Sequence, residues 1–315
     1  MTPAMMELCV VDRSPRGLVI VRGEDARSFL QSLVSQDLNP LGDGDGVRSL
    51  LLVPQGKLDV DFRALRVGDG WWLDCDADDA ARLAASLTRF KLRVKATLAD
   101  ETSASGLATV FGAEGPAQVA AMTGQAVPDR VCAHVGWGGC RIVRAAWPGQ
   151  IAIDIVGPRG EVEAARRALI ETGITEMTPS AFEAARIRAG IPRLGIDVDD
   201  TTIPQEAFLE QDAVSFTKGC FLGQELVTRI DTRGHVNRYL RVLDVEGAVA
   251  PPPGAMIEVE DKSVGTVTSA VVDPGGAVVA LGMVRREVEP PATVVLRWEG
   301  GEAGAMINVR RAASA

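Results

Sequence analysis

The chain has 315 residues, of which 46% are hydrophobic and 24% charged, and its formal net charge is -9. Such a length is enough for two or three domains with full cores, and the composition is that of an ordinary globular protein. The negative charge argues against a nucleic-acid backbone or an anionic membrane as the main partner, although a small anionic ligand in a local basic pocket stays compatible with it.

The first part of the chain predicts alternating strands and helices. Gly17–Val21 has the composition of a strand, and apolar residues from Ala26 to Val34 then recur at helical spacing. Strands are predicted over 48–53 and 58–67, joined by a Pro-Gln-Gly-Lys turn. Asp59 and Asp61 alternate along the second of these strands and therefore share one face.

A unit of strand, turn, strand and helix occurs twice. The first copy ends with a strand over 71–75 and a helix over 78–90, and the second has strands over 140–146 and 151–156 before a helix over 161–171. Two such units predict an α+β core made of two related layers packed together. Further strands are expected over 91–98 and 106–111. Later, Ser180 and Glu183 have the spacing of a capping box that opens another helix.

The composition changes after Gly234. Six short β-rich runs separated by Pro and Gly clusters predict a small antiparallel barrel or jelly roll. We therefore expect an α+β core over 1–235, with internal boundaries near 46–50 and 110–150, and a β-barrel over 236–315. The six runs cover 240–245, 255–259, 264–272, 278–283, 293–298 and 305–309.

The cysteines and the chain's start indicate a cytoplasmic protein. Five cysteines without a C-x-x-C spacing are typical of a reducing compartment. Cys132, His134 and Cys140 match no zinc or iron–sulfur spacing, so no metal site is expected. Neither a signal peptide nor a run of about eighteen apolar residues is present, so no membrane partner is expected.

The densest group of reactive and turn-forming residues covers 218–225. Cys220 lies between two glycines, follows Lys218 by two residues and precedes a short helix predicted to begin at Gln224. A nearby ammonium and a helix amino terminus both favour a thiolate. A lone cysteine is ordinarily structural, but its neighbours favour a functional thiol. The run reads Lys-Gly-Cys-Phe-Leu-Gly-Gln-Glu.

This run resembles the signature of the YgfZ-type folate-binding proteins, which are relatives of the glycine-cleavage T-protein (GcvT), an aminomethyltransferase. Eight consecutive positions fit, with Phe221 where the family usually has Tyr. The likeness continues at 203–207, Ile-Pro-Gln-Glu-Ala, and at Arg229 and Arg233-Gly234. It implies a GcvT-like three-domain cloverleaf: two interleaved antiparallel-sheet α+β subdomains and a C-terminal barrel.

The resemblance also implies a tetrahydrofolate ligand and a set of site residues. Glu206 would accept two hydrogen bonds from the amino group and the adjacent ring N–H of the pterin. Asp61 or the neighbouring Val60 falls where T-proteins have a catalytic aspartate. Arg229 would pair with a carboxylate of the ligand tail or of the protein. Gln224 and Glu225 would fix the loop, and Lys218 would tune the thiol of Cys220.

Three functions follow, in order of preference. The first is a folate-binding protein that supports iron–sulfur cluster enzymes through Cys220, with apo-proteins or assembly factors as partners and no catalytic turnover required. The second is a folate-dependent aminomethyl- or methyltransferase. T-proteins usually have an acidic residue at the position of Cys220, and a clean pair of aspartates is missing here, so this function is less favoured. The third is a thiol-redox scaffold without folate turnover.

Overall fold

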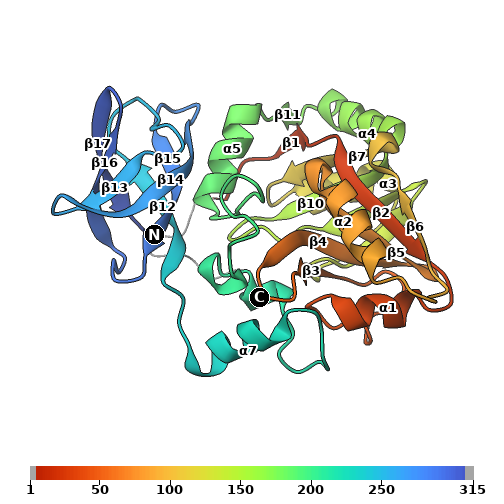
Figure 1. Cartoon of the computed structure of the whole chain (residues 1–315). Helices are drawn as coiled ribbons and strands as arrows, with labels where there is room; N and C mark the ends of the chain where they lie inside the picture. The colour runs from red at the N-terminus through yellow and green to blue at the C-terminus, as the bar shows by residue number, and fades with distance from the viewer. Residues whose placement is uncertain (1–4, 309–315) are drawn as a thin grey trace. The chain divides into compact units, whose positions relative to one another are not determined.

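A computed structural model describes residues 5–308, and the chain forms two compact units (Figure 1). Unit 1 contains the chain up to Met177 together with Gln211–Gln224. Unit 2 contains Thr178–Glu210 and the chain from Glu225 onward. The segment with the cysteine motif is therefore an excursion of the chain back into unit 1. Within residues 5–308, no helix is long and apolar enough to cross a membrane.

The first sheet of unit 1 is antiparallel, with the strand order β3-β4-β5-β2-β6. Two helices cover one face of it, because Leu30 of α1 and Leu83 of α2 share a core with Val60 and Leu73 of the sheet. The elements are β2 (Arg16–Arg22), α1 (Ala26–Leu33), β3 (Gly46–Leu52), β4 (Leu58–Val67), β5 (Gly70–Asp76), α2 (Ala77–Arg89) and β6 (Thr97–Asp100).

The second sheet of unit 1 has the order β11-β1-β7-β10-β9-β8, in which only β1 and β11 pair in parallel among the described strands. Val162 and Leu169 of α4 pack on it beside Ile153. The elements are β1 (Cys9–Asp12), η1 (Thr102–Ala104), β7 (Ser105–Phe111), α3 (Gly115–Thr123), β8 (His134–Trp137), β9 (Cys140–Arg144), β10 (Ala152–Pro158), α4 (Arg159–Glu171) and β11 (Thr175–Glu176).

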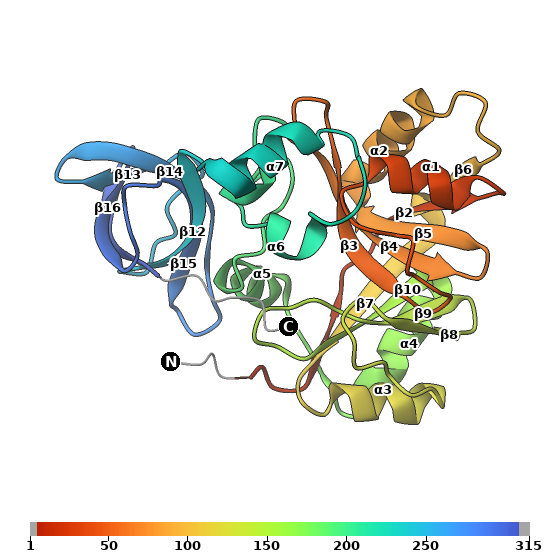
Figure 2. The same cartoon turned by 90° about the horizontal axis from the view of Figure 1, so that it is seen from below.

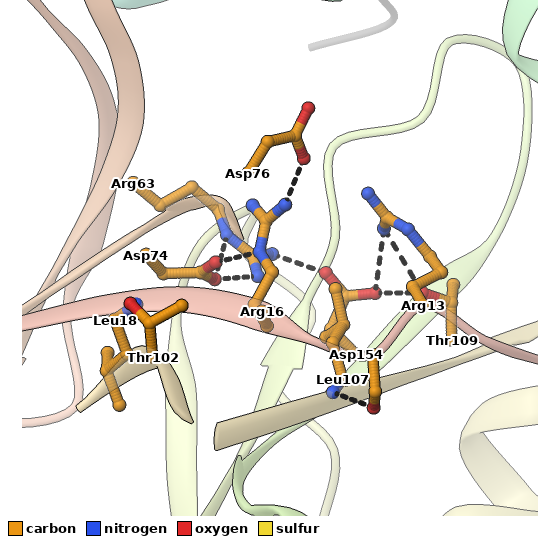
Figure 3. Close-up of polar contacts among 11 residues, drawn as sticks. Arg13, Arg16, Leu18, Arg63, Asp74, Asp76, Thr102, Leu107, Thr109 and Asp154 are labelled. Atoms are coloured by element: carbon orange, nitrogen blue, oxygen red, sulfur yellow. Dashed lines mark hydrogen bonds and ion pairs between the residues drawn. The ribbon is translucent and has the colours of Figure 1, made fainter. Parts of the chain in front are cut away.

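The predicted repeat is confirmed, because β4, β5 and α2 match β9, β10 and α4 in order. The two sheets are also interleaved: β1, at the start of the chain, pairs with β7 of the second sheet, whereas β2 belongs to the first. Between the sheets, Leu18 and Trp72 pack against Leu107 and Val156. Figure 3 shows the charged side chains that lie beside this cluster.

Unit 2 ends in a closed barrel of six described strands, in the order β12-β15-β14-β13-β16-β17, which Figure 2 shows as a ring. All six β-rich runs of the sequence form strands, and Val309, the last residue of the sixth run, lies outside the described residues. The elements of this part are α5 (Pro179–Arg188), η2 (Pro204–Glu206), α7 (Gln224–Arg233), β12 (Arg238–Val245), β13 (Met256–Val259), β14 (Lys262–Val272), β15 (Val278–Arg285), β16 (Ala292–Trp298) and β17 (Gly301–Ile307). The short helix α6 (Glu210–Ala213) lies in unit 1 except for its first residue.

Two local predictions were wrong. The helix α5 is capped by Thr178, whose side chain accepts from Ala181 N, and not by Ser180. The strand expected over 91–98 is shorter, since β6 begins at Thr97. Before it, Arg93 has a left-handed φ of 58° and Lys95 N donates to the Asp25 carboxylate, which diverts the backbone from a ladder.

Candidate functional site

Lys218 is held by the end of helix α1. Its ammonium donates to the carbonyl oxygens of Gln31, Val34 and Gln36, at 2.8, 2.6 and 3.0 Å. The last carbonyls of a helix have no partner within the helix, so a buried lysine satisfies them here. Burial lowers the pKa of Lys218 to about 8, an effect that Asp37 partly offsets. Lys218 thus ties the motif loop to α1.

The rest of the loop is fixed by backbone contacts. Leu222 N donates to Leu33 O at 3.3 Å, and Ser35 Oγ donates to Ala213 O at 2.6 Å. Gly223 has a φ of +77°, and a Cβ on it would lie 2.5 Å from Val53 O, so the position accepts glycine alone. Gly223 and Lys218 of the motif therefore both serve to hold the loop in its conformation.

Cys220 is exposed, whereas the other four cysteines, all within the described residues, are buried. Burial raises the pKa of Cys75 above the usual thiol range and that of Cys9 to about 11, so both are held as thiols. The loop thus presents one accessible thiol on a backbone anchored on both sides.

Asp61 is paired within unit 1. Both of its carboxylate oxygens accept hydrogen bonds from Arg48. Arg48 Nη1 also donates to the carboxylate of Asp212, at 3.3 Å. Val60 lies in the core under α1 and α2, so Asp61 occupies the opposite face of β4. Sequence analysis missed Arg48 and Asp212, and the pairing register of β3 with β4 was the available signal for Arg48.

Glu206 lies in unit 2 and is buried, at 6% exposure. Oε1 accepts from Arg238 Nε at 3.1 Å, and Oε2 accepts from Ile203 N at 3.1 Å and from Arg238 Nη2 at 3.4 Å. The neighbouring Gln205 donates its amide to Val227 O at 2.9 Å, which joins this turn to α7. Sequence analysis missed Arg238, which lies at the start of the first barrel strand.

Helix α7 places three further predicted residues. Gln224, its first residue, belongs to unit 1, and Glu225 and Arg229 belong to unit 2. Glu225 and Arg229 are both exposed. Among the described residues, no carboxylate forms an ion pair with the Arg229 guanidinium. Of the predicted site residues, unit 1 therefore contains Asp61, Lys218, Cys220 and Gln224, and unit 2 contains Glu206, Glu225 and Arg229.

The two interleaved sheets and the six-stranded barrel define the fold of the glycine-cleavage aminomethyltransferases. A crystal structure of the aminomethyltransferase T from Bartonella henselae superposes with a TM-score of 0.83 and 22% identity, covering 98% of this chain and 88% of the other. The family described as the GCVT N-terminal domain matches residues 4–218. The chain belongs to this family.

Relatives of two kinds are about equally similar to the chain. An aminomethyltransferase of Rubrobacter xylanophilus is 26% identical over 292 residues, covering 91% of this chain and 78% of the relative. The tRNA-modifying protein YgfZ of Cronobacter sakazakii is 26% identical over 308 residues, covering 95% and 91%. The YgfZ protein of an Escherichia coli O157:H7 strain is likewise 26% identical, over 305 residues, covering 93% and 90%. Identity alone therefore does not choose between the two activities.

Proposed function

We propose that this chain is a YgfZ-type protein that binds a tetrahydrofolate and uses Cys220 to support the assembly or repair of iron–sulfur cluster enzymes in the cytoplasm. The observation that carries the proposal is the single exposed thiol on a loop anchored by Lys218. An accessible thiol on a fixed backbone can reach a partner protein, whereas the four buried cysteines cannot.

The folate part of the proposal rests on Glu206. A carboxylate has about four acceptor sites, and three are used by Ile203 N and the two nitrogens of Arg238. A bidentate contact with the pterin needs one site on each oxygen. Oε1 has one left, and Oε2 gains one when its longest contact, Arg238 Nη2 at 3.4 Å, opens. Arg238 Nε would then still orient the carboxylate.

Other charged groups would complete the ligand contacts. The guanidinium of Arg229, which has no ion pair within residues 5–308, suits a carboxylate of the folate tail. Asp61 would act as a contact only through a carboxylate already neutralised by Arg48. Gln224 and Glu225 begin the helix that follows the thiol loop and would keep the loop in place. When bound, the folate supplies a one-carbon carrier or a reduced pterin.

A single thiol such as that of Cys220 is too few to hold an iron–sulfur cluster alone. Iron–sulfur clusters are held by about four thiolates, so one thiol would contact a cluster transiently or together with a partner's ligands. The partners would be iron–sulfur apo-proteins or assembly factors. The relatives' name, tRNA-modifying, fits a chain of net charge -9 if such a chain acts on an enzyme and not on the RNA itself.

The second candidate is an aminomethyltransferase, because relatives of that name match as well as the others. Its chemistry needs an acid or base beside the folate nitrogen. Asp61 is the candidate, but both of its oxygens already accept hydrogen bonds from Arg48, so the carboxylate is engaged within the protein. A thiol-redox scaffold without folate is the third.

Calorimetry with tetrahydrofolate tests the ligand. We expect binding to the wild type, a loss of about tenfold or more in affinity for Glu206→Gln and Arg229→Gln, and little change for Cys220→Ala. Glu299→Gln, an exposed barrel residue, is the matched control. Absence of binding by the wild type would leave the scaffold as the leading function.

Activity of iron–sulfur enzymes in cells lacking the protein tests the thiol. Wild type and Glu299→Gln should restore that activity, and Cys220→Ser should not, even though it still binds folate. Restoration by Cys220→Ser would remove the thiol from the mechanism. Release of an aminomethyl product by the purified protein with a carrier-bound amine would instead favour the second candidate.

A further inference from the structure

A hollow of about 570 Å³ lies in unit 2 at one end of the barrel. It is distinct from the groups assigned above, because no residue proposed to contact folate lines it. Two of its residues begin strand β12, and three follow the end of strand β15, to which β12 is hydrogen-bonded. Its lining consists of Phe208, Tyr239, Arg241, Arg286, Glu287 and Glu289.

The strand alternation places the hollow at the mouth of the barrel. Tyr239 and Arg241 share a face of β12 with Leu243 and Val245, which lie in the barrel core. Arg238, which pairs with Glu206, has the opposite parity and faces the other side of the strand. Arg241 is farther along β12 than Tyr239 and therefore lies deeper in the mouth. Barrel mouths are frequent ligand sites.

Aromatic rings form one wall of the hollow. Phe208 and Tyr239 are stacked with centroids 5.1 Å apart and an interplanar angle of 17°. The guanidinium carbon of Arg241 lies 4.8 Å from the Tyr239 centroid and 5.7 Å from that of Phe208. Phe208 adopts a left-handed φ of 60°, which is unfavourable for an aromatic residue. The backbone thus bears strain to place this ring against the arginine.

Arg241 is half-buried, and no carboxylate forms an ion pair with it among the described residues. Its Nε is shielded from solvent and has no hydrogen-bond acceptor among the described residues. Burial lowers the pKa of Arg241, and an electrostatic contribution from Tyr239 opposes this effect. A guanidinium has five N–H donors and is not deprotonated in proteins, so a charge without an ion pair among the described residues lines the hollow. Buried charges are ordinarily paired.

We propose that this hollow binds the oxyanion of a small metabolite, a carboxylate or phosphate group, through Arg241 with the help of Arg286. The planar fork of an arginine suits both kinds of group. Arg286 lies at the exposed rim, and its side chain has no ion pair among the described residues. The stacked rings keep Arg241 fixed in one orientation, so little side-chain entropy is lost when the anion binds.

The rim restricts which anions enter. Glu287 and Glu289 line the same hollow, and Glu287 is paired with Arg285 at 3.6 Å. These carboxylates repel large polyanions, so the site selects a small ion that reaches the guanidinium at the inner end. Folate binding through Glu206 is not required for this inference, and the two can fail separately.

Fluorine NMR gives a direct test, because Tyr239 is the chain's sole tyrosine. Labelling the full chain with 3-fluorotyrosine gives a single resonance beside Arg241. Titration with inorganic phosphate or glutarate should shift this resonance saturably, whereas sodium chloride at equal ionic strength should not. A response to phosphate alone identifies a phosphate ester as the ligand class, and a response to glutarate alone identifies a carboxylate.

Variants separate this site from general charge effects. Arg241→Gln and Arg286→Gln should each weaken the titration about tenfold or more, and Arg297→Gln, on an outer position of the same barrel, should leave it unchanged. Arg286 is exposed, so its variant should fold even if Arg241→Gln does not. The proposal is overturned if neither ion gives a saturable shift, or if both hollow variants titrate as the wild type does.

Discussion

Lys218 belongs to the predicted motif, but its observed contacts are structural and differ from the electrostatic effect that we expected. The sequence places it two residues before a thiol, which predicts an electrostatic effect on Cys220. In the structure its ammonium has three carbonyl partners, one in the last turn of α1 and two just after the helix, which precede it by more than 180 positions. A sequence carries no sign of such a distant cap, because the three acceptors are backbone groups that every residue has.

Replacing Lys218 should therefore act on stability before it acts on chemistry. Lys218→Met leaves three carbonyls near the end of α1 without their donor, and we expect a loss of about 2–4 kcal/mol in the free energy of unfolding. Lys95→Met, which removes only an exposed pair with Glu24, should change it by less than about 0.5 kcal/mol. Urea denaturation measures both. Equal stability of the two variants would show that water replaces the ammonium.

Of the ion pair between Glu206 and Arg238, the sequence predicted only the glutamate. The resemblance selected the glutamate, but without it an exposed loop carboxylate was the expectation. The structure buries it against an arginine 32 residues later in the chain. That arginine begins a barrel strand, and nothing in a strand pattern tells which of its polar residues turns toward a distant loop.

At the scale of single elements, hydrophobic periodicity predicted the fold well where elements are long. The helices α1, α2 and α4 and all six barrel strands lie within a few residues of their expected positions. The strands β1, β8 and β11 were not predicted; each has four residues or fewer, too short for an alternating pattern to be distinguished from a loop.

Helix α5 offers a test of the corrected cap. Ser180 has the sequence of a capping box, but Pro179 occupies the first turn, and its fixed φ suits the N1 position. The helix therefore begins two residues earlier, and Thr178 becomes the cap. Thr178→Ala should lower the free energy of unfolding by about 1 kcal/mol, and Ser180→Ala by a few tenths at most. Thermal unfolding of the two variants compares them. The reverse order would restore the predicted box.

Helix α2 contains a carboxylate whose charge opposes folding. Burial, and then the charge of Asp76, raises the pKa of Asp79 to about 6, from 3.8 in the unfolded chain. The folded state therefore binds more protons between pH 4 and 6, and stability falls as the pH rises through that window. Asp79→Asn should remove this slope and stabilise the protein at pH 7 by about 1–2 kcal/mol, a value reduced for residual solvent screening.

Denaturant titrations of Asp79→Asn at pH 4.5 and pH 7 are the measurement. Asp78→Asn, on the neighbouring position of the same first turn, is the control and should keep the slope. If Asp79→Asn is less stable than the wild type at pH 7, the interaction of Asp79 with the amino terminus of α2 outweighs its burial.

At the scale of the molecule, unit 1 is joined by a buried layer of charges between its two sheets (Figure 3). Asp74 accepts from both Arg16 and Arg63, and Arg63 also donates to Asp154 at 2.6 Å. Burial alone would raise the pKa of Asp74, but the two arginines outweigh it and lower the pKa. Its contribution is therefore present above about pH 4 and is lost as the pH falls through its folded value.

Asp74→Asn should weaken the ion pairs of this layer. It leaves two buried arginines short of a counter-charge, and we expect a loss of about 3–5 kcal/mol from unit 1. Hydrogen exchange followed by mass spectrometry should show faster exchange in β4, β5 and β10, and unchanged exchange in the barrel strands β14 and β15. Uniform acceleration over both units would mean that the chain unfolds as one cooperative whole.

The sequence could not have predicted this layer, although it predicted the sheets that bear it. Arg63 and Asp154 are 91 residues apart and lie on different sheets. Their strands were recognised from local pattern, whereas their contact depends on how the two layers face each other, which no local pattern records.

The excursion of residues 211–224 into unit 1 has a consequence for synthesis of the protein. Helix α1 leaves the ribosome long before Lys218, whose partner Val34 precedes it by 184 residues. In the nascent first unit these carbonyls therefore remain bonded to water until α5 and the segment that contains Lys218 have been translated. The loop that presents Cys220 is thus among the last parts of unit 1 to be placed. A chain that ends before residue 218 would contain all the described strands of unit 1 and no thiol loop.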